Sequence, residues 1–271
     1  MYVGVDVGGT KTLVAVLDAH GVIKERMKFL TPQDYDEFLE QLRQALDGFK
    51  TRDFKVGGIG VPGVLDRKHG RALDFANLPW RNVSVQHDVE RICDCPMAIE
   101  NDAKLAGLSE AMLLKNKYAK VLYVTVSTGI GIALIDNQVI DTNIGDSGGA
   151  SLIVENKEQL VSWESFASGH AIVERFGKKA MDITDEKTWA IIARDLSKGM
   201  IELIALAEPD AIVIGGSVGT YFDRYGALLS AELKKYDLPL LTIPPILGAQ
   251  RPEEAVIYGC YDLARQVYPH A

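Results

Sequence analysis

The 271-residue sequence has little cysteine, no long apolar run and no excess of positive charge. Its three cysteines, Cys93, Cys95 and Cys260, are too few for a disulfide framework, which favours a reducing, intracellular environment. No apolar stretch approaches the roughly 20 residues that a membrane span requires. The formal net charge of −8 argues against non-specific binding to nucleic acid or to an anionic membrane. We therefore expect neither as a partner.

The pattern also lacks a signal peptide and a flexible linker. The chain opens Met-Tyr-Val-Gly-Val-Asp, and an acidic residue this early is unlike a secretory signal, so we expect a cytoplasmic protein. The composition, 47% hydrophobic and 24% charged, is that of a globular protein, and the length suffices for two modest lobes. Without a Pro/Ser-rich linker, two lobes should pack closely, with a ligand-binding cleft between them.

Apolar periodicity predicts the same order of elements twice. Three strands are expected at 2–7, 12–18 and 22–29, with Gly8-Gly9 as the first turn. The second half repeats this with strands at 120–126, 130–135 and 138–141 and the turn Thr128-Gly129. The remaining elements are, in chain order, a helix at 34–49, a strand at 56–61, a helix at 83–93, a strand at 97–99, a helix opening near 102, a helix at 185–207, a strand at 211–214, and helices at 221–235 and 252–267. The repetition predicts a duplicated nucleotide-binding architecture.

The segment from Asp6 to Lys11 has the composition of a phosphate-binding turn. Gly8 and Gly9 permit a tight turn and a close approach of phosphate oxygens to the backbone. Thr10 adds a hydroxyl donor and Lys11 a cation. Asp6, at the end of the strand, is a hard oxygen ligand that could hold Mg²⁺ directly or through water. Taken alone, the segment is also compatible with a plain hairpin in which Asp6 is solvated.

Three other candidate residues have ordinary structural explanations when read alone. Asp102 stands at the start of a predicted helix, where Asp is a standard N-cap. Asn77, in Asn-Leu-Pro-Trp, is typical of a turn. Gly215-Gly216 follows a predicted strand, as in any strand-to-helix turn. Local pattern alone therefore leaves their roles open.

Eight separated segments, in the same order, resemble motifs of the ROK sugar kinases, which belong to the superfamily of actin, hexokinase and the heat-shock chaperone ATPases. They are Asp6-Val-Gly-Gly-Thr-Lys11, Gly58-Ile-Gly-Val-Pro-Gly63, Asn77-Leu-Pro-Trp80, Ile99-Glu-Asn-Asp-Ala103, Thr125 to Gly131, Gly145 to Gly149, Trp163-Glu-Ser-Phe-Ala-Ser-Gly169 and Ile212-Val-Ile-Gly-Gly216. The resemblance covers nearly the whole chain. It implies an α/β, two-lobed actin-like ATPase (ribonuclease H-like) fold with an inter-lobe cleft. The implied lobes are 1–117 plus 252–271, and 118–251.

The resemblance also implies a reaction, the ATP-dependent phosphorylation of a monosaccharide hydroxyl with Mg²⁺. Asp102 aligns with the family's general base, which would orient and deprotonate the hydroxyl. The residues implied to bind ATP are Gly8, Gly9, Thr10, Lys11, Thr128, Gly129, Gly215 and Gly216. Those implied to bind the sugar are Asn77, Asn101, Asp102, Asp146 and Glu164.

The sequence departs from the family where a structural zinc is usual. The family has Gly-Glu-x-Gly-His followed by a cysteine cluster, whereas this chain has Gly145 to Gly149 without histidine and no cysteine in 150–163. A structural zinc site needs four protein ligands, so we expect no zinc. The family histidine also helps to position the sugar, and the choice among glucose, mannose, an N-acetylhexosamine or a rarer sugar stays open.

Smaller departures occur in the two nucleotide loops. Ser127 and Ser217 stand where the family has glycine, and His170 stands where proline is usual. For His170, an exposed position at a helix start is the simplest interpretation.

Two functions from different classes remain. One is a competent sugar kinase, and the other is a sugar- or nucleotide-binding sensor on the same fold with weak or no activity. Loss of the zinc motif slightly favours the sensor. The kinase is favoured more strongly by the retained residues Asp6, Thr10, Asn101, Asp102, Thr128 and Glu164. The expected partners are a small sugar and ATP, and the expected assembly is a homodimer.

Overall fold

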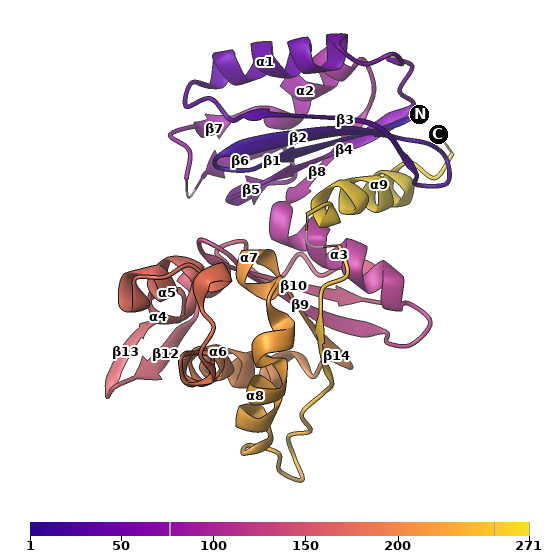
Figure 1. The fold of residues 1–271 in the computed structure, drawn as a ribbon. Coiled ribbons are helices and arrows are strands. Elements are labelled where there is room, and N and C mark those ends of the chain that lie inside the picture. Colours follow the sequence, from indigo (N-terminus) through magenta and orange to yellow (C-terminus); the bar gives the residue numbers. More distant parts are fainter. Residues whose placement is uncertain (76, 252, 271) are drawn as a thin grey trace. The chain divides into compact units, whose positions relative to one another are not determined.

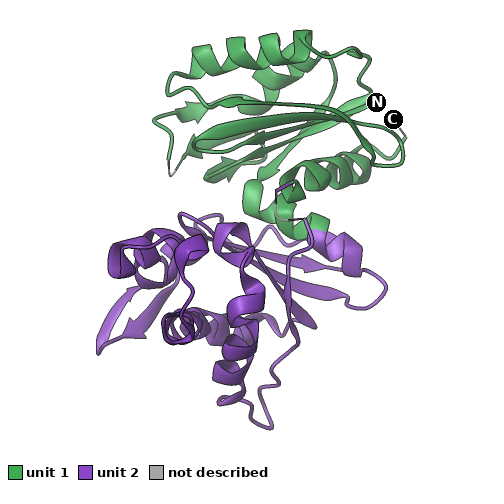
Figure 2. Cartoon of the chain, in the orientation of Figure 1, with its two compact units in different colours: residues 1–109, 254–271 green, residues 110–253 purple. Residues whose placement is uncertain are grey.

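The computed structural model describes residues 1–75, 77–251 and 253–270, which form two compact units (Figure 2). Unit 1 comprises residues 1–109 and 254–271, and unit 2 comprises residues 110–253. The chain crosses from one to the other within helix α3 (Asp102–Leu114). Pro252, with which the predicted helix 252–267 begins, and Ala271 lie outside the described residues.

Unit 1 is built on a five-stranded sheet in the order β3-β2-β1-β4-β8 (Figure 1). Its strands are β1 (Tyr2–Val7), β2 (Lys11–Leu17), β3 (Ile23–Leu30), β4 (Val56–Val61) and β8 (Met97–Asn101). The first three form an antiparallel meander, whereas β1, β4 and β8 run parallel. A smaller antiparallel sheet contains β5 (Val64–Asp66), β6 (Arg71–Asp74) and β7 (Arg81–Val83).

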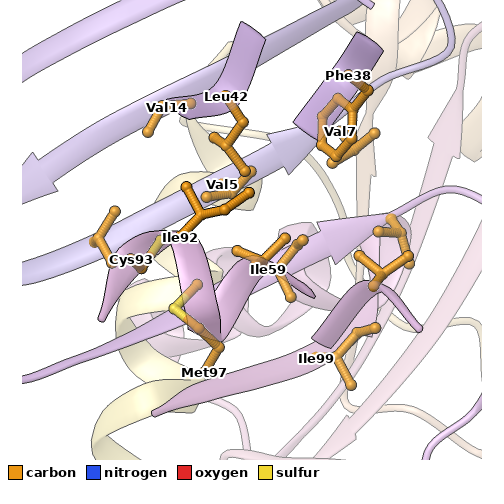
Figure 3. Packing of buried hydrophobic residues seen from close by; sticks show 14 of the residues in the cluster. Val5, Val7, Val14, Phe38, Leu42, Ile59, Ile92, Cys93, Met97 and Ile99 are labelled. Atoms are coloured by element: carbon orange, nitrogen blue, oxygen red, sulfur yellow. The ribbon is translucent and has the colours of Figure 1, made fainter. Parts of the chain in front are cut away.

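Helices cover both faces of the large sheet in unit 1. On one face, α1 (Tyr35–Asp47) and α2 (Val85–Cys93) bury apolar side chains against Val5 and Ile59 (Figure 3). Side chains alternate between faces along a strand, so Gly4 and Gly58 point the other way. There, a Cβ at Gly58 would lie 2.5 Å from the Cys260 carbonyl oxygen of α9 (Ala255–Val267). The glycines therefore let α9 lie directly on the sheet.

The sheet of unit 2 repeats that arrangement, in the order β11-β10-β9-β14-β15. Its strands are β9 (Lys120–Val126), β10 (Ile130–Asp136), β11 (Val139–Ile140), β14 (Ala211–Gly215) and β15 (Ile246–Gly248). Again a three-stranded antiparallel meander is followed by two parallel strands. The predicted repetition is confirmed.

The other elements of unit 2 surround this sheet and a large apolar core. They are η1 (Gly148–Ala150), the hairpin β12 (Ile153–Asn156) and β13 (Gln159–Ser162), α4 (Glu164–Ala167), α5 (Gly169–Phe176), η2 (Ala180–Asp182), α6 (Glu186–Ala207), α7 (Gly216–Gly219) and α8 (Phe222–Lys234). In the core, Trp189 stacks on Tyr225 with ring centroids 5.2 Å apart. None of the helices in the described part of the chain combines the length and apolar character that crossing a bilayer requires.

Candidate active site

Three strands of the unit 1 sheet place residues in register near their carboxyl ends. Asp6 of β1 pairs with Gly60 of β4, which pairs with Glu100 of β8. Neighbours in register point to the same face, so Asp6 and Glu100 share a face, with no side chain between them. A Cβ at Gly60 would lie 2.9 Å from Leu105 Cδ1 and 3.7 Å from Asp102 Cα. Gly60 thus allows the first turn of α3 to approach the sheet beside Asp6.

Asp6 and Asp102 interact electrostatically. Burial, followed by the negative charge of Asp102, raises the pKa of Asp6 from 3.8 to about 7, while Lys28 opposes the shift. The carboxylates expected to serve as metal ligand and general base therefore lie in one acidic cluster of unit 1. A cation bound there would relieve their repulsion.

The glycine turn after β1 lies against Asn77. A Cβ at Gly9 would come within 2.7 Å of Asn77 Cβ, so the glycine permits their close contact. Thr31 braces the same turn, because its Oγ1 donates to the Gly8 carbonyl at 2.7 Å and its amide donates to the Thr10 carbonyl at 3.0 Å. Unit 1 thus brings the expected phosphate turn next to an expected sugar-contacting residue. Lys11, the first residue of β2, is exposed.

At the junction of β8 and α3, Asn101 is the residue that caps the helix. The sequence pattern had suggested Asp102 for this role. Asn101 Oδ1 accepts from the Lys104 amide at 3.2 Å, and its Nδ2 donates to the Gly63 carbonyl at 3.2 Å. Asp102 is the first residue of the helix, and its Oδ1 accepts from the Ala103 amide at 2.7 Å. The buried Asn101 therefore fixes the backbone that presents Asp102.

In unit 2, the turn between β9 and β10 is tied to the start of α5. The amide of Gly169 donates to the Ser127 carbonyl at 2.7 Å, and that of His170 donates to the Thr128 carbonyl at 3.3 Å. The Ser127 hydroxyl also lies 3.3 Å from that of Ser217, so the two serines at family glycine positions contact each other.

The glycines at the end of β14 serve close packing. Gly216 adopts φ of 83°, which favours glycine, and a Cβ there would lie 2.5 Å from the Val126 carbonyl oxygen. A Cβ at Gly215 would overlap the Tyr123 hydroxyl. These two residues therefore bring α7 against the turn that contains Ser127.

The carboxylate of Glu164 accepts a hydrogen bond at the end of the same turn. Its Oε2 accepts from the Ile130 amide at 2.7 Å, and a Cβ at Gly129 would lie 2.5 Å from that oxygen. Asp146, the other acidic residue expected near the sugar, lies partly buried in the segment before η1. The structure thus brings Glu164 to the expected phosphate turn.

Gly149, at the position of the family histidine, lies against apolar side chains. A Cβ at Gly149 would lie 2.8 Å from Ile130 Cβ and 3.4 Å from Trp163 Cε3, so a histidine at this position would require its neighbours to move. Trp163 is fully buried, and its Nε1 donates to the Asp195 carbonyl at 3.1 Å. Within the described ranges, no cluster of three His, Cys, Asp or Glu side chains could hold a metal ion.

A cavity of about 350 Å³ opens beside the Ser127 turn in unit 2. Its lining is Ser127, Thr128, Gly169, His170, Val173, Lys179, Ala180, Met181, Ser217, Val218 and Tyr221. The polar part of this lining contains the hydroxyl groups of Ser127, Thr128 and Ser217 and the amine of Lys179. The apolar part contains Val173, Met181 and Val218. Although the chain is acidic, none of these lining residues is a carboxylate. Such a lining fits an anionic ligand with a flat apolar portion.

Sequence reasoning missed His170, Lys179, Met181 and Tyr221 as residues of this pocket. His170 is exposed at the start of α5, as expected, and it also lines the cavity. No motif marks these positions, because they come from three segments that are brought together only by the packing of α5, η2 and α7. The sequence marked Ser127 and Ser217 as departures from family glycines but did not predict their contact.

Two similar α/β units, one with a glycine turn beside a carboxylate pair and one with a hydroxyl-lined cavity, form the duplicated architecture expected of a nucleotide-binding protein. The profile of the ROK family matches residues 2–267, and the chain belongs to this family. The predicted resemblance is therefore confirmed.

Curated relatives match over most of their own length. A glucokinase of Streptomyces coelicolor is 25% identical, with 98% of each chain covered. An N-acetylgalactosamine kinase of Shewanella sp. strain ANA-3 is 28% identical, with 85% of this chain and 86% of the relative covered. The crystal structure of a ROK family glucokinase from Streptomyces griseus, in complex with glucose and AMPPNP, has a TM-score of 0.84 at 23% identity, covering 98% and 99% of the two chains. The predicted actin-like α/β fold is thus confirmed.

Proposed function

We propose that this chain is an ATP-dependent kinase that phosphorylates a hydroxyl of a monosaccharide. The observation that carries the proposal is the cluster of Asp6, Asp102 and the Gly8-Gly9 turn at the carboxyl ends of parallel strands in unit 1. Family membership and the names of full-length relatives support the same reaction class. A binding-only sensor is not favoured, because these relatives are named as enzymes.

In this proposal Asp102 is the general base. Phosphoryl transfer depends mainly on positioning and on electrostatic stabilisation of the transferring group, so a carboxylate needs to hold the acceptor hydroxyl in line and take its proton. Asp102 suits this role because its backbone is fixed by Asn101 and the start of α3. Asn77, Asn101, Asp146 and Glu164 are the proposed sugar contacts.

Asp6 is the proposed ligand of Mg²⁺. Mg²⁺ binds through one or two carboxylates together with substrate phosphates, and Asp6 offers a carboxylate whose pKa is raised by burial and by the nearby charge of Asp102. The donor chemistry therefore fits the metal. When bound, Mg²⁺ would neutralise phosphate charge and orient the phosphates. Asp6 would hold the metal, directly or through water, at the turn formed by Gly8, Gly9, Thr10 and Lys11.

The cavity in unit 2 is the proposed nucleotide pocket. Ser127, Thr128 and His170 form the polar end, where the phosphates would lie with Gly129. Val218 and Tyr221, which follow Gly215 and Gly216, offer apolar surface to the base. A volume of about 350 Å³ lies in the range of small-molecule sites.

The sugar is assigned only as a class. The relatives are named for glucose and for N-acetylgalactosamine, so the family accepts different sugars. The histidine that would help to select among them is replaced here by Gly149. The homodimeric state and cytoplasmic location stay predictions.

ADP release from Mg-ATP, measured with a panel of monosaccharides, tests the proposal. We expect at least one sugar to stimulate release, and expect Asp102→Asn to lower turnover by about 100-fold, the usual contribution of a general base. The matched control is Asp34→Asn, because Asp34 caps α1 in the same unit and asparagine caps equally well. Sugar-independent release throughout the panel would refute the kinase. Full turnover in a folded Asp102→Asn variant would remove Asp102 from the mechanism.

A further inference from the structure

Arg67 and Glu100 form a largely buried ion pair beside the acidic cluster of unit 1. Arg67 Nε lies 3.1 Å from Glu100 Oε1 and 2.9 Å from Oε2, and Arg67 Nη2 also donates to Oε1. The Glu100 side chain is 5% exposed and that of Arg67 is 27% exposed. A planar guanidinium that engages both carboxylate oxygens fixes the direction of the carboxylate as well as its charge.

The pair joins two parts of unit 1. Arg67 follows β5 in the turn that leads to β6, and Glu100 lies in β8, in register with Gly60 and Asp6. The small sheet that contains β5 and β6 continues through the loop of Asn77 to β7. One ion pair therefore connects the segment that carries Asn77 to the strand that ends beside Asp102.

Glu100 also holds the backbone next to Asp102, the proposed base. Its Oε1 also accepts from the Asn101 amide at 2.7 Å. Asn101 in turn holds the Lys104 amide and the Gly63 carbonyl, so the turn from β8 into α3 is fixed from both sides. Asp102 lies within that turn. The position of the Asp102 carboxylate therefore depends on the position of this backbone.

We propose that Arg67 is a positioning residue for phosphoryl transfer, acting through Glu100 to hold Asp102 in line with the acceptor hydroxyl. This inference rests on the proposed kinase function. A displacement of a reacting group by about 1 Å costs on the order of 100-fold in rate, so even a small rotation of Glu100 should be visible in turnover. Arg67 is not among the residues that line the cavity of unit 2, so we expect its replacement to leave nucleotide binding there unchanged.

Four variants separate positioning from stability. Arg67→Lys keeps the charge without the two-point contact, and Arg67→Met removes the charge. The double variant Arg67→Met with Glu100→Gln also removes the unpaired buried carboxylate, which restores folding if Arg67→Met is unstable. Lys68→Met is the matched control, because Lys68 is exposed in the same turn and loses the same charge.

Thermal unfolding, ADP binding and steady-state kinetics are measured for each variant with the sugar that the panel identifies. We expect turnover to fall about 10-fold in Arg67→Lys and about 100-fold in Arg67→Met, with the KM for ATP and the affinity for ADP unchanged. The double variant should regain thermal stability but stay at least about 10-fold slow. Lys68→Met should turn over normally.

The outcomes are distinguishable from failure of the kinase itself. A wild-type protein without sugar-dependent ADP release refutes the proposed function. If the wild type is active and the double variant regains both stability and turnover, Arg67 is only structural and the inference is wrong. Wild-type turnover in Arg67→Lys together with Arg67→Met would also overturn it.

Discussion

Replacing Gly199 by alanine adds one methyl group inside α6, a change that normally stabilises a helix by about 1 kcal/mol. In this structure the methyl group would overlap the indole of Trp163, with its Cε3 only 2.6 Å away. Trp163 cannot easily move, because it is fully buried and its Nε1 is bonded to the Asp195 carbonyl. The two effects therefore oppose each other.

The relative size of these two effects decides whether Gly199→Ala stabilises or destabilises the protein. Overpacking a well-filled core costs about 1–3 kcal/mol, and this site belongs at the upper end because several ring atoms are overlapped at once. Subtracting the helix gain leaves an expected loss of about 2 kcal/mol for Gly199→Ala. Urea unfolding with an unchanged slope would measure it.

Two further variants test the cause. In Gly226→Ala, on α8, the three atoms nearest to the new methyl group all belong to the ring of Phe222, which is partly exposed and can move, so the loss should be much smaller. Combining Gly199→Ala with Trp163→Leu should show a favourable coupling of about 0.5–3 kcal/mol, because the smaller side chain leaves room for the methyl group. A gain of about 1 kcal/mol in Gly199→Ala alone would refute the reasoning.

Three other measurements follow from single features. Tyr225→Phe should raise unfolding stability by about 1 kcal/mol, because the buried Tyr225 hydroxyl has no hydrogen-bond partner among the described residues; a loss would point to an unseen partner. The hydrogen bond from Lys24, with those from the Val22 and His20 amides, lowers the pKa of Asp18 from 3.8 to about 2. A depressed carboxyl pKa stabilises the fold above about pH 4, and this stabilisation is lost as the pH falls towards 2, so thermal unfolding of Asp18→Asn should converge on wild type at acidic pH. Purified protein should hold no stoichiometric zinc, and chelation followed by Mg²⁺ should leave activity unchanged; one tightly held zinc per chain by elemental analysis would contradict this.

Elements with strong periodicity were predictable from the sequence. The first strand was expected at 2–7 and is Tyr2–Val7, and the long helix expected at 185–207 is Glu186–Ala207. These segments bury one consistent face or lie wholly inside, so hydrophobic spacing reports them directly. The repeat of such segments predicted the duplicated architecture, whereas the order of the strands within each sheet comes from the structure.

Short elements and contacts across the sequence were not predictable. The hairpin of β12 and β13 has exposed apolar residues, Ile153 and Leu160, and only Val154 of the hairpin is buried, so its apolar pattern does not mark a core-facing strand. Asn101 and Asp102 are both good capping residues, and only the backbone conformation shows that Asn101 is the one that caps α3. The Arg67–Glu100 pair and the cavity at His170 depend on residues far apart in the chain, for which a single sequence has no local signal.

The position of α9 has a consequence for how the protein is made. Unit 1 buries Leu13 and Leu17 against Ile257 and Tyr261, yet the whole of unit 2 is translated before that helix emerges. At ribosomal rates of about 5–20 residues per second, the interval is roughly 7–30 s. Unit 2 is one continuous stretch, so one sheet face of the nascent unit 1 has no covering helix for as long as unit 2 is being synthesised. Unit 1 should therefore complete its core only after α9 has been made, and its uncovered apolar face is open to misassembly during that interval.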